Sequence, residues 1–299
     1  RHIGPSEENQ FKMLKKLNYK SLDDLIDNTV PEKIQFKGEL NIGESNSEYE
    51  ALRKLKAISK KNQIYSNFIG MGYYGTYTPY VILRNILENP GWYTSYTPYQ
   101  PEVAQGRLEM LLNFQQMIVD FTGMDIANAS LLDEGTAAAE AMGLSHRLNK
   151  SDSNLVFVSE NCHPQTIDVI QTRAEPMGLK VLVGNEDKVL EQLKEDIVCG
   201  ILQYPGTLGD IKDPSEAVSK IHKKNGKAIL ACDLLALAKL KTPRELGADI
   251  AVGSSQRFGI PMGYGGPHAA FFATKDEYKR SMPGRIVGVS VDRHGNKAY

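Results

Sequence analysis

The first part of the chain carries apolar side chains at helical spacing, each run behind a residue that can cap a helix. Ser6, Ser21 and Ser47 each precede apolar positions at intervals of three and four residues. An acid stands three residues after the second and the third of these serines, as in a capping box. The pattern predicts three short helices that form an arm over residues 1–64 and pack on something larger. A plain helical surface layer is the alternative interpretation.

The next segment, residues 65–105, is rich in tyrosine, glycine and proline. It holds eight of the 14 tyrosines and the only tryptophan, Trp92. The glycines and prolines predict a loop-rich segment around one helix over residues 79–89. Because tyrosine has an apolar ring and a polar tip, this composition favours an interface or a ligand entrance. A loop layer that merely covers the core is the alternative.

One long helix is expected after this segment. Pro101 suits the first position of a helix, and Gly123 suits the position just past its end. Leucines and other apolar residues between them trace a single face. The pattern predicts a helix of about 20 residues.

From residue 125 to 274 the apolar period alternates between that of strands and that of helices. This alternation predicts an α/β fold with a mostly parallel sheet covered on both faces. Ligands of such sheets bind at the carboxyl ends of the strands, so the residues that follow each strand are the candidates for chemistry. The expected strands cover residues 155–158, 179–183, 198–202, 228–231, 250–252 and 269–273. The expected helices cover residues 136–148, 164–177, 188–194 and 214–224.

The composition is that of an ordinary globular protein. Hydrophobic residues make up 41% of the 299 residues, charged residues 24%, and the formal net charge is −1. This balance argues against disorder and against a nucleic-acid or anionic-membrane partner. Cys162, Cys199 and Cys232 lack metal-ligand spacing and indicate a reduced intracellular compartment and no metal site. A chain that starts at Arg1 and ends without a closing helix is expected to be a fragment.

A run of small residues after residue 133 is a candidate phosphate site. Gly135, Thr136 and Ala137 open a predicted helix, whose free amides can bind an anion. Glu134 is unfavourable beside a phosphate, and an alanine-rich buried helix would explain the same pattern. The sequence contains neither a Walker A motif nor a Gly-x-Gly-x-x-Gly motif after a strand.

Two polar residues follow predicted strands. His163 could stack on a planar cofactor or act as an acid or base, although a lone histidine is more often a polar cap on the next helix. Asp233 could pair with a protonated ring nitrogen of a cofactor, or it could be the N-cap of the segment that follows.

The order of these features resembles pyridoxal-phosphate enzymes of the aspartate-aminotransferase type. The chain closely resembles the glycine cleavage system P-protein family, the glycine dehydrogenases (decarboxylating). It resembles the long form of this family, in which both halves share one chain, more than the split form with two subunits. The runs that carry the resemblance are residues 96–102 (YTPYQPE), 129–137 (ASLLDEGTA), 253–259 (GSSQRFG) and 264–270 (YGGPHAA).

The resemblance implies a pyridoxal-phosphate fold type I large domain over residues 106–299, truncated before its small domain. The helical arm and the tyrosine-rich segment precede it. It also implies that the whole protein uses pyridoxal phosphate to decarboxylate glycine and passes the aminomethyl group to the lipoyl arm of H-protein. The chain would be the N-terminal half, about a third of the long form, and would work in the mitochondrial matrix of a eukaryote or the cytoplasm of a bacterium.

The resemblance also assigns positions. Arg257 stands where a functional half has its Schiff-base lysine, and a guanidinium cannot supply the neutral amine that an imine needs. No catalytic residue is therefore expected in this half, and pyridoxal phosphate is expected to be bound covalently by the other half. The residues expected to form a cofactor-like site are Glu134, Gly135, Thr136, Ala137, His163, Asp233, Ser255 and Arg257.

The expected partners are the C-terminal half or a second copy of the protein, lipoylated H-protein, and glycine. The candidates for contact with a partner are Tyr96, Tyr99, Glu102, Gly265, Gly266 and His268. Two alternatives are a purely structural assembly half and an independent pyridoxal-phosphate lyase or aminotransferase, which Arg257 disfavours.

Overall fold

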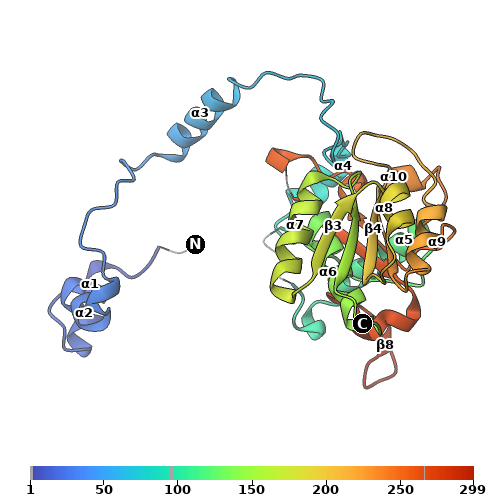
Figure 1. Ribbon diagram of the computed structural model, residues 1–299. Coiled ribbons are helices and arrows are strands. Elements are labelled where there is room, and N and C mark those ends of the chain that lie inside the picture. The colour runs from blue at the N-terminus through green and yellow to red at the C-terminus, as the bar shows by residue number, and fades with distance from the viewer. Residues whose placement is uncertain (1–2, 94–96, 266) are drawn as a thin grey trace. The chain divides into compact units, whose positions relative to one another are not determined.

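The computed structural model describes residues 3–93, 97–265 and 267–299 (Figure 1). The chain forms two compact units, Arg1–Tyr65 and Ser66–Tyr299. The predicted candidate chemistry lies in the second unit.

The first unit contains the three expected helices, α1 (Glu7–Lys16), α2 (Leu22–Thr29) and α3 (Glu48–Ser59). Ser6, Ser21 and Ser47 each accept a hydrogen bond from the backbone at the start of a helix, as predicted. Only α3 has a complete capping box, because the acid at the start of α2 accepts from the backbone of Lys20 instead of from Ser21. None of the three helices has a buried residue.

The predicted helix over residues 79–89 is a short helix, α4 (Tyr80–Ile82), followed by a π-helical turn, Leu83–Leu87. The long helix that follows is α5 (Gln105–Thr122), and Gly123 ends it with a φ of 69°, as expected. Its predicted start at Pro101 is wrong. Pro101 begins a separate 3₁₀ turn, Pro101–Val103, because the backbone at Ala104 leaves the helical region (φ −123°, ψ 18°).

In the part of the chain that the structure describes, seven strands form the main sheet, in the order β1-β7-β6-β5-β4-β2-β3. All six expected strands are present, and β2 to β6 pair in parallel. The seventh strand, β1, was not predicted, and it and β7 run antiparallel to their neighbours. The strands are β1 (Ile126–Ala127), β2 (Leu155–Ser159), β3 (Lys180–Gly184), β4 (Cys199–Tyr204), β5 (Lys227–Cys232), β6 (Ile250–Ser254) and β7 (Ala270–Thr274).

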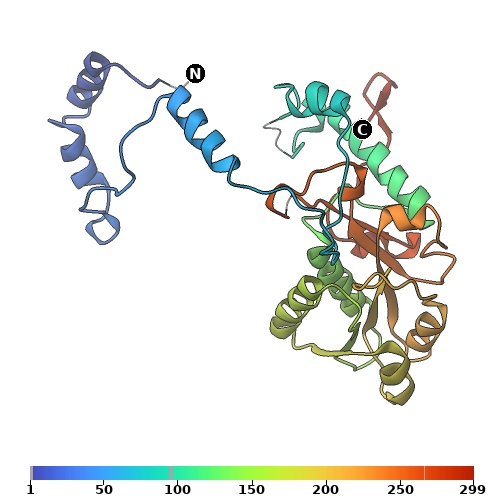
Figure 2. The same ribbon diagram turned by 90° about the horizontal axis from the view of Figure 1, so that it is seen from above.

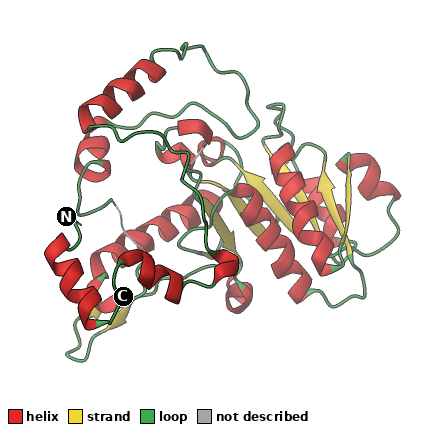
Figure 3. Ribbon diagram, turned by 90° about the vertical axis from the view of Figure 1, so that its left-hand side faces the viewer, coloured by secondary structure: helices red, strands yellow, loops and turns green. Residues whose placement is uncertain are grey.

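Helices cover both faces of this sheet (Figure 3). One face is covered by α6 (Glu134–Leu148) and α7 (Pro164–Ala174). The other is covered by α5, α8 (Glu186–Gln192), α9 (Ser215–His222) and α10 (Leu234–Leu237). The remaining short turns are Glu32–Ile34, Glu175–Met177, Gln256–Phe258, Gly263–Gly265 and Asp276–Ser281.

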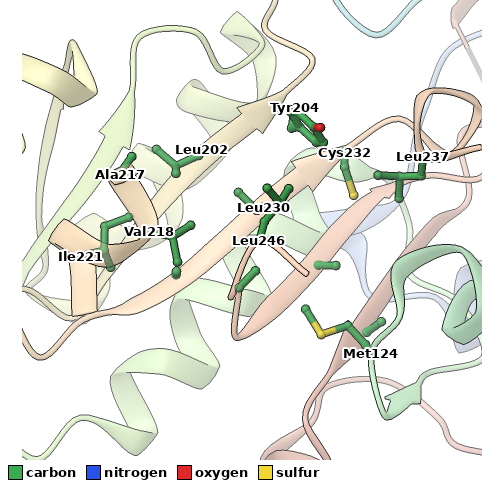
Figure 4. Close-up of a cluster of buried hydrophobic side chains, with 14 of the residues drawn as sticks. Met124, Leu202, Tyr204, Ala217, Val218, Ile221, Leu230, Cys232, Leu237 and Leu246 are labelled. Atoms are coloured by element: carbon green, nitrogen blue, oxygen red, sulfur yellow. The ribbon is translucent and has the colours of Figure 1, made fainter. Parts of the chain in front are cut away.

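The core lies in two layers, one on each side of the sheet. Alternate residues of a strand point to opposite faces, so Leu202 and Leu230 belong to one layer while Ile201 and Ile229 belong to the other. Figure 4 shows the first layer, where Val218 and Ile221 from α9 lie against the strand leucines.

The C-terminal residues return to the start of α5. A small hairpin, β8 (Ser290–Val291) with β9 (Lys297–Ala298), precedes Tyr299. The C-terminus lies near the first turn of α5 (Figure 2). The Tyr299 backbone N–H donates to Gln105 Oε1 at 2.9 Å, and Gln105 Nε2 donates to the Tyr299 carbonyl at 3.1 Å.

Candidate functional site

The polar residues expected after the strands meet at the carboxyl edge of the sheet. His163 follows β2, Asp233 follows β5, and Arg257 follows β6, while Glu134 begins α6. A cavity of about 330 Å³ opens at this edge. It is lined by Gly72, Tyr73, Leu132, Asp133, Glu134, Gly135, His163, Gln165, Thr166, Ser254, Pro267 and His268.

Arg257 and Asp233 form a bidentate ion pair. Arg257 Nε donates to Asp233 Oδ1 at 2.9 Å, and Nη2 donates to Oδ2 at 3.0 Å. The two side chains are only 19% and 15% exposed, so water screens the pair weakly. Asp233 Oδ1 also accepts from the backbone of Leu235 at 3.3 Å and caps α10, so the N-cap interpretation is confirmed.

The Arg257 guanidinium contacts Asp233 at the end of β5 and also the tyrosine-rich segment. It lies 4.1 Å from the ring centroid of Tyr74 and donates to the Gly75 carbonyl. Close by, Thr76 Oγ1 donates to the carbonyl of Ile260 at 2.7 Å. The tyrosine-rich segment is therefore bound to the loop that follows β6, and Tyr74 is a site residue that sequence reasoning did not single out.

A glycine permits this close approach. Gly259 has a φ of 113°, and a Cβ there would lie 2.7 Å from the carbonyl oxygen of Tyr77. A side chain at this position would separate the two segments. The Gly-rich loop after β6 signals such a contact in the sequence, but it does not say which segment makes the contact.

His163 is buried and faces a hydroxyl. Its Nδ1 lies 3.1 Å from Thr207 Oγ1. His163 occupies the N-cap position of α7, but its side chain makes no capping bond there. A Cβ on Gly72 would lie 3.2 Å from its Cδ2, so the Gly72 backbone covers the ring. Burial lowers the pKa of His163 to about 4, although the charge of Asp233 opposes the shift. The imidazole is therefore neutral at pH 7.

Glu134 lies beside this imidazole, with Oε1 3.8 Å from His163 Nε2. Burial raises the pKa of Glu134 to about 7, and the charges of Asp233 and Asp133 add to the shift. Hydrogen bonds from Gln203 and the Ser254 backbone oppose it. Between pH 4 and 7 both Glu134 and His163 are therefore neutral, and their proximity is not an ion pair over that range.

The residues at this edge do not fit pyridoxal phosphate. At the start of α6, Asp133 Oδ1 accepts from the Thr136 backbone at 2.7 Å, so a carboxylate already occupies an amide that a phosphate would need. Glu134 follows it, and a phosphate would face two carboxyl groups. Gly135 and Ala137 are buried within α6, as the alanine-rich helix interpretation expects. Arg257 occupies both oxygens of Asp233, the acid expected to pair with a ring nitrogen.

Two of the remaining candidates, Ser255 and His268, make contacts at this edge of the sheet. Ser255 is buried and donates to the Ala269 carbonyl at 2.5 Å, which links the loop after β6 to the start of β7. His268 lines the cavity, and its ring meets that of Tyr73 edge to face at 5.3 Å between centroids.

Three other contact candidates, Tyr99, Glu102 and Gly265, do not line the cavity. Tyr99 is 72% exposed, with the Arg285 guanidinium 4.5 Å from its ring centroid. Glu102 is exposed in the turn before α5, and Gly265 lies in the 3₁₀ turn Gly263–Gly265. Two further candidates, Tyr96 and Gly266, lie outside the described residues.

Among the described residues, no group of three or more His, Cys, Asp or Glu side chains is placed to hold a metal ion. The helices of that same part of the chain include none that is both long and apolar enough to cross a membrane.

The sheet order, the helical layers and the edge defined by β2, β5 and β6 are those of the α/β fold of pyridoxal-phosphate-dependent enzymes. The structure of a sphingosine-1-phosphate lyase from Burkholderia pseudomallei shares this fold, with a TM-score of 0.60 at 12% identity over 90% of this chain and 67% of that one.

The family model for the glycine cleavage system P-protein matches residues 1–299. The chain belongs to this family. The crystal structure of a glycine decarboxylase (P-protein) in inhibitor-bound form superposes with a TM-score of 0.89 at 33% identity. That match covers 100% of this chain and 68% of the other.

Curated relatives carry the name glycine dehydrogenase (decarboxylating). That of Pelagibacter ubique is 84% identical over 299 residues, and that of Synechocystis sp. is 59% identical over 298 residues. Both alignments cover 100% of this chain, which spans only 31% and 30% of the length of these relatives.

Proposed function

We propose that this chain is the half of a glycine dehydrogenase (decarboxylating) that holds no covalent cofactor. In the whole protein, glycine would be decarboxylated and its aminomethyl group passed to the lipoyl arm of H-protein. Pyridoxal phosphate, when bound, supplies an electron sink for the loss of the carboxyl group. We place that cofactor on another part of the protein, the C-terminal half or a second chain.

One observation carries the proposal: the bidentate pair between Arg257 and Asp233. A guanidinium stays protonated and cannot form an imine, so Arg257 cannot replace a Schiff-base lysine. The same guanidinium neutralises the carboxylate that would otherwise attract a protonated ring nitrogen. The carboxyl groups of Asp133 and Glu134 at the start of α6 further disfavour a phosphate.

Exposed aromatic side chains support a partner. Within the second unit, Tyr77 and Tyr99 of the tyrosine-rich segment are 74% and 72% exposed. Exposed aromatic side chains are typical of surfaces that become buried on assembly. We assign these surfaces to the other half of the enzyme, with Tyr99 and Glu102 as contact candidates.

Borohydride reduction of the full-length protein tests where the cofactor is bound. Reduction converts an imine into a stable secondary amine, and peptide mapping by mass spectrometry then locates it. We expect the phosphopyridoxyl group on a lysine outside these 299 residues. A stoichiometric adduct on a lysine of this chain would instead support the independent lyase or aminotransferase alternative.

The structural alternative is a half that only supports assembly. Four variants of the full-length protein distinguish this alternative from a half that helps to form the active site. They are Tyr96→Ala, Tyr99→Ala, Glu102→Ala and Arg257→Ala. We expect at least one variant that assembles normally by size-exclusion chromatography to lose glycine turnover. Normal assembly with unchanged turnover in all four would favour the structural alternative.

A further inference from the structure

The ion pair between Arg257 and Asp233 leaves the neighbouring cavity open. Neither residue lines that cavity of about 330 Å³, which lies within the range of small-ligand pockets. Its lining includes the two acids Asp133 and Glu134 and neither lysine nor arginine. A carboxylate or a phosphate would meet the charge of Asp133 and would disfavour ionisation of Glu134, whereas a cation would favour it, so the lining favours a cation.

Polar atoms of the lining are left without partners. Glu134 Oε1, Thr166 Oγ1 and His268 Nε2 are each buried and make no hydrogen bond to any residue that the structure describes. Thr166 is only 1% exposed, so bulk water does not solvate its hydroxyl. A buried polar atom without a partner is costly, and side chains from three separate segments share this condition around one cavity. A ligand with several N–H donors would satisfy them together.

One wall of the cavity is aromatic. The rings of Tyr73 and His268 meet at 82° with 5.3 Å between their centroids. An aromatic face next to a carboxyl group is a favourable site for an ammonium group, because the ring quadrupole attracts a cation. The aromatic wall and the two acids therefore both favour a cationic ligand.

We propose that this cavity binds a primary ammonium group, with Glu134 as its carboxyl partner, Thr166 as a hydroxyl acceptor and Tyr73 as its aromatic wall. A primary ammonium has three N–H donors, which matches the number of unpartnered polar atoms. This site does not rest on the proposed function. It is defined by its lining residues, which are the same whether or not an imine forms elsewhere in the protein.

The ammonium group has two chemical sources. One is a small free amine, and the other is a lysine side chain from another segment of the full-length protein or from a second copy of it. Both place the same group against the Glu134 carboxyl, and an experiment can tell them apart because only the lysine is covalently part of the protein.

The first arm uses methylammonium as the probe. The full-length protein is reduced with borohydride and dialysed, so that no imine elsewhere consumes the amine, and methylammonium chloride is titrated by calorimetry. We expect saturable binding that weakens about tenfold or more in Glu134→Gln, since a hydrogen bond to a charged group is lost. Thr166→Val should weaken it less. Glu191→Gln, the same change on the exposed surface of α8, should leave it unchanged.

The second arm tests the lysine source. A water-soluble carbodiimide joins a carboxyl group to a lysine amine only where the two are in contact. If a lysine of the protein fills the cavity, methylammonium does not bind, and mass spectrometry finds an amide between Glu134 and that lysine. The same amide must be missing in Glu134→Gln.

Three results would overturn the proposal. They are the absence of both methylammonium binding and a Glu134 cross-link, unchanged binding in Glu134→Gln, and equally strong binding of tetramethylammonium, which has no N–H donor. Thermal unfolding of each variant verifies that it folds. If Glu134→Gln does not fold, the comparison of Thr166→Val with the wild type decides, and unchanged binding there overturns the proposal.

Discussion

Arg257 donates two hydrogen bonds to Asp233, at 2.9 and 3.0 Å, across 24 residues of sequence. The pair joins the ends of β5 and β6, and Tyr74 packs on the outer face of the guanidinium. Arg257 therefore neutralises the mostly buried carboxylate of Asp233 at the carboxyl edge of the sheet, beside the open cavity.

The Arg257–Asp233 pair should show strong coupling. Arg257→Met leaves a mostly buried carboxylate without its partner, and we expect the free energy of unfolding to fall by about 3 kcal/mol. Adding Asp233→Asn removes the unpaired charge and should recover part of that loss. Urea unfolding of the two single variants and the double variant gives the coupling energy. Additive effects would mean that the pair contributes no interaction energy.

Glu134 should make stability fall as pH rises. Its pKa is raised from 4.5 to about 7 in the folded protein, so the folded state binds a proton that the unfolded state has already lost. Stability from this group is complete below pH 4.5 and declines up to pH 7, by about 3 kcal/mol. Glu134→Gln should therefore equal the wild type at pH 4.5 and exceed it at pH 8.

The buried His163 has the opposite pH dependence. Its lowered pKa means that its contribution to stability is lost as pH falls from 6.5 through 4. His163 is present in both proteins, so this effect cancels in the difference between Glu134→Gln and the wild type. Urea unfolding without added amine provides the measurement. A difference that stays constant from pH 4.5 to 8 would contradict the prediction.

Asp249 should contribute stability that is lost in acid. It lies just before β6 and accepts from His222 Nε2 and from the backbone of Ala228, each at 2.8 Å, and from Lys275 Nζ at 2.6 Å. Burial opposes the shift, but these bonds lower the pKa of Asp249 to about 2 from its ordinary value of 3.8.

The stabilisation by Asp249 is present above pH 3.8 and is lost as pH falls to 2, a change of about 2 kcal/mol. We expect Asp249→Asn to be less stable at pH 6 and to lose less stability on acidification than the wild type. Asp168→Asn on the exposed side of α7 should follow the wild type. Thermal unfolding of Asp249→Asn and the wild type at pH 6 and pH 3 provides the measurement. We expect the difference in stability between the two proteins to shrink at pH 3, and an equal difference at both pH values would refute the prediction.

Gly253 in β6 should not tolerate a methyl group. A Cβ there would lie 2.2 Å from the carbonyl oxygen of Cys232 and 2.7 Å from the ring of Phe271. The clash involves backbone and a buried ring, so we expect Gly253→Ala to destabilise the protein by about 1–3 kcal/mol. Gly106→Ala in α5 meets nothing within 4 Å and should be neutral or stabilising. Equal thermal stability of the two variants would be the contrary result.

Local features of the sequence predicted most of the fold. The alternation of apolar periods placed six strands and both layers of helices, because each element buries one face and must repeat apolar residues at its own period. The start of α5 was misplaced because a proline suits the first turn of a 3₁₀ helix as well as that of an α-helix. The strand β1 has only two residues, too few to show a period.

The candidate site was predicted as a set of residues but not as an arrangement. The identity of Arg257 was enough to exclude an imine at its position, since that follows from the guanidinium alone. The sequence also ordered His163 and Asp233 after strands, and parallel strands bring such residues to one edge. It could not pair Arg257 with Asp233, because the sequence does not state which neighbour a cation will meet across the sheet.

The sequence by itself determined the class of fold, the three serine helix caps and the absence of an imine-forming amine at position 257, because these depend on single residues and short periods. Tertiary structure alone decided the antiparallel direction of β7, the packing of Tyr74 on Arg257 and the burial of Glu134. Each of these joins segments that are far apart in the chain. Burial is the physical reason. The pKa of a carboxyl group rises only when packing has excluded water around it, and a cation pairs strongly with a carboxylate only under the same condition.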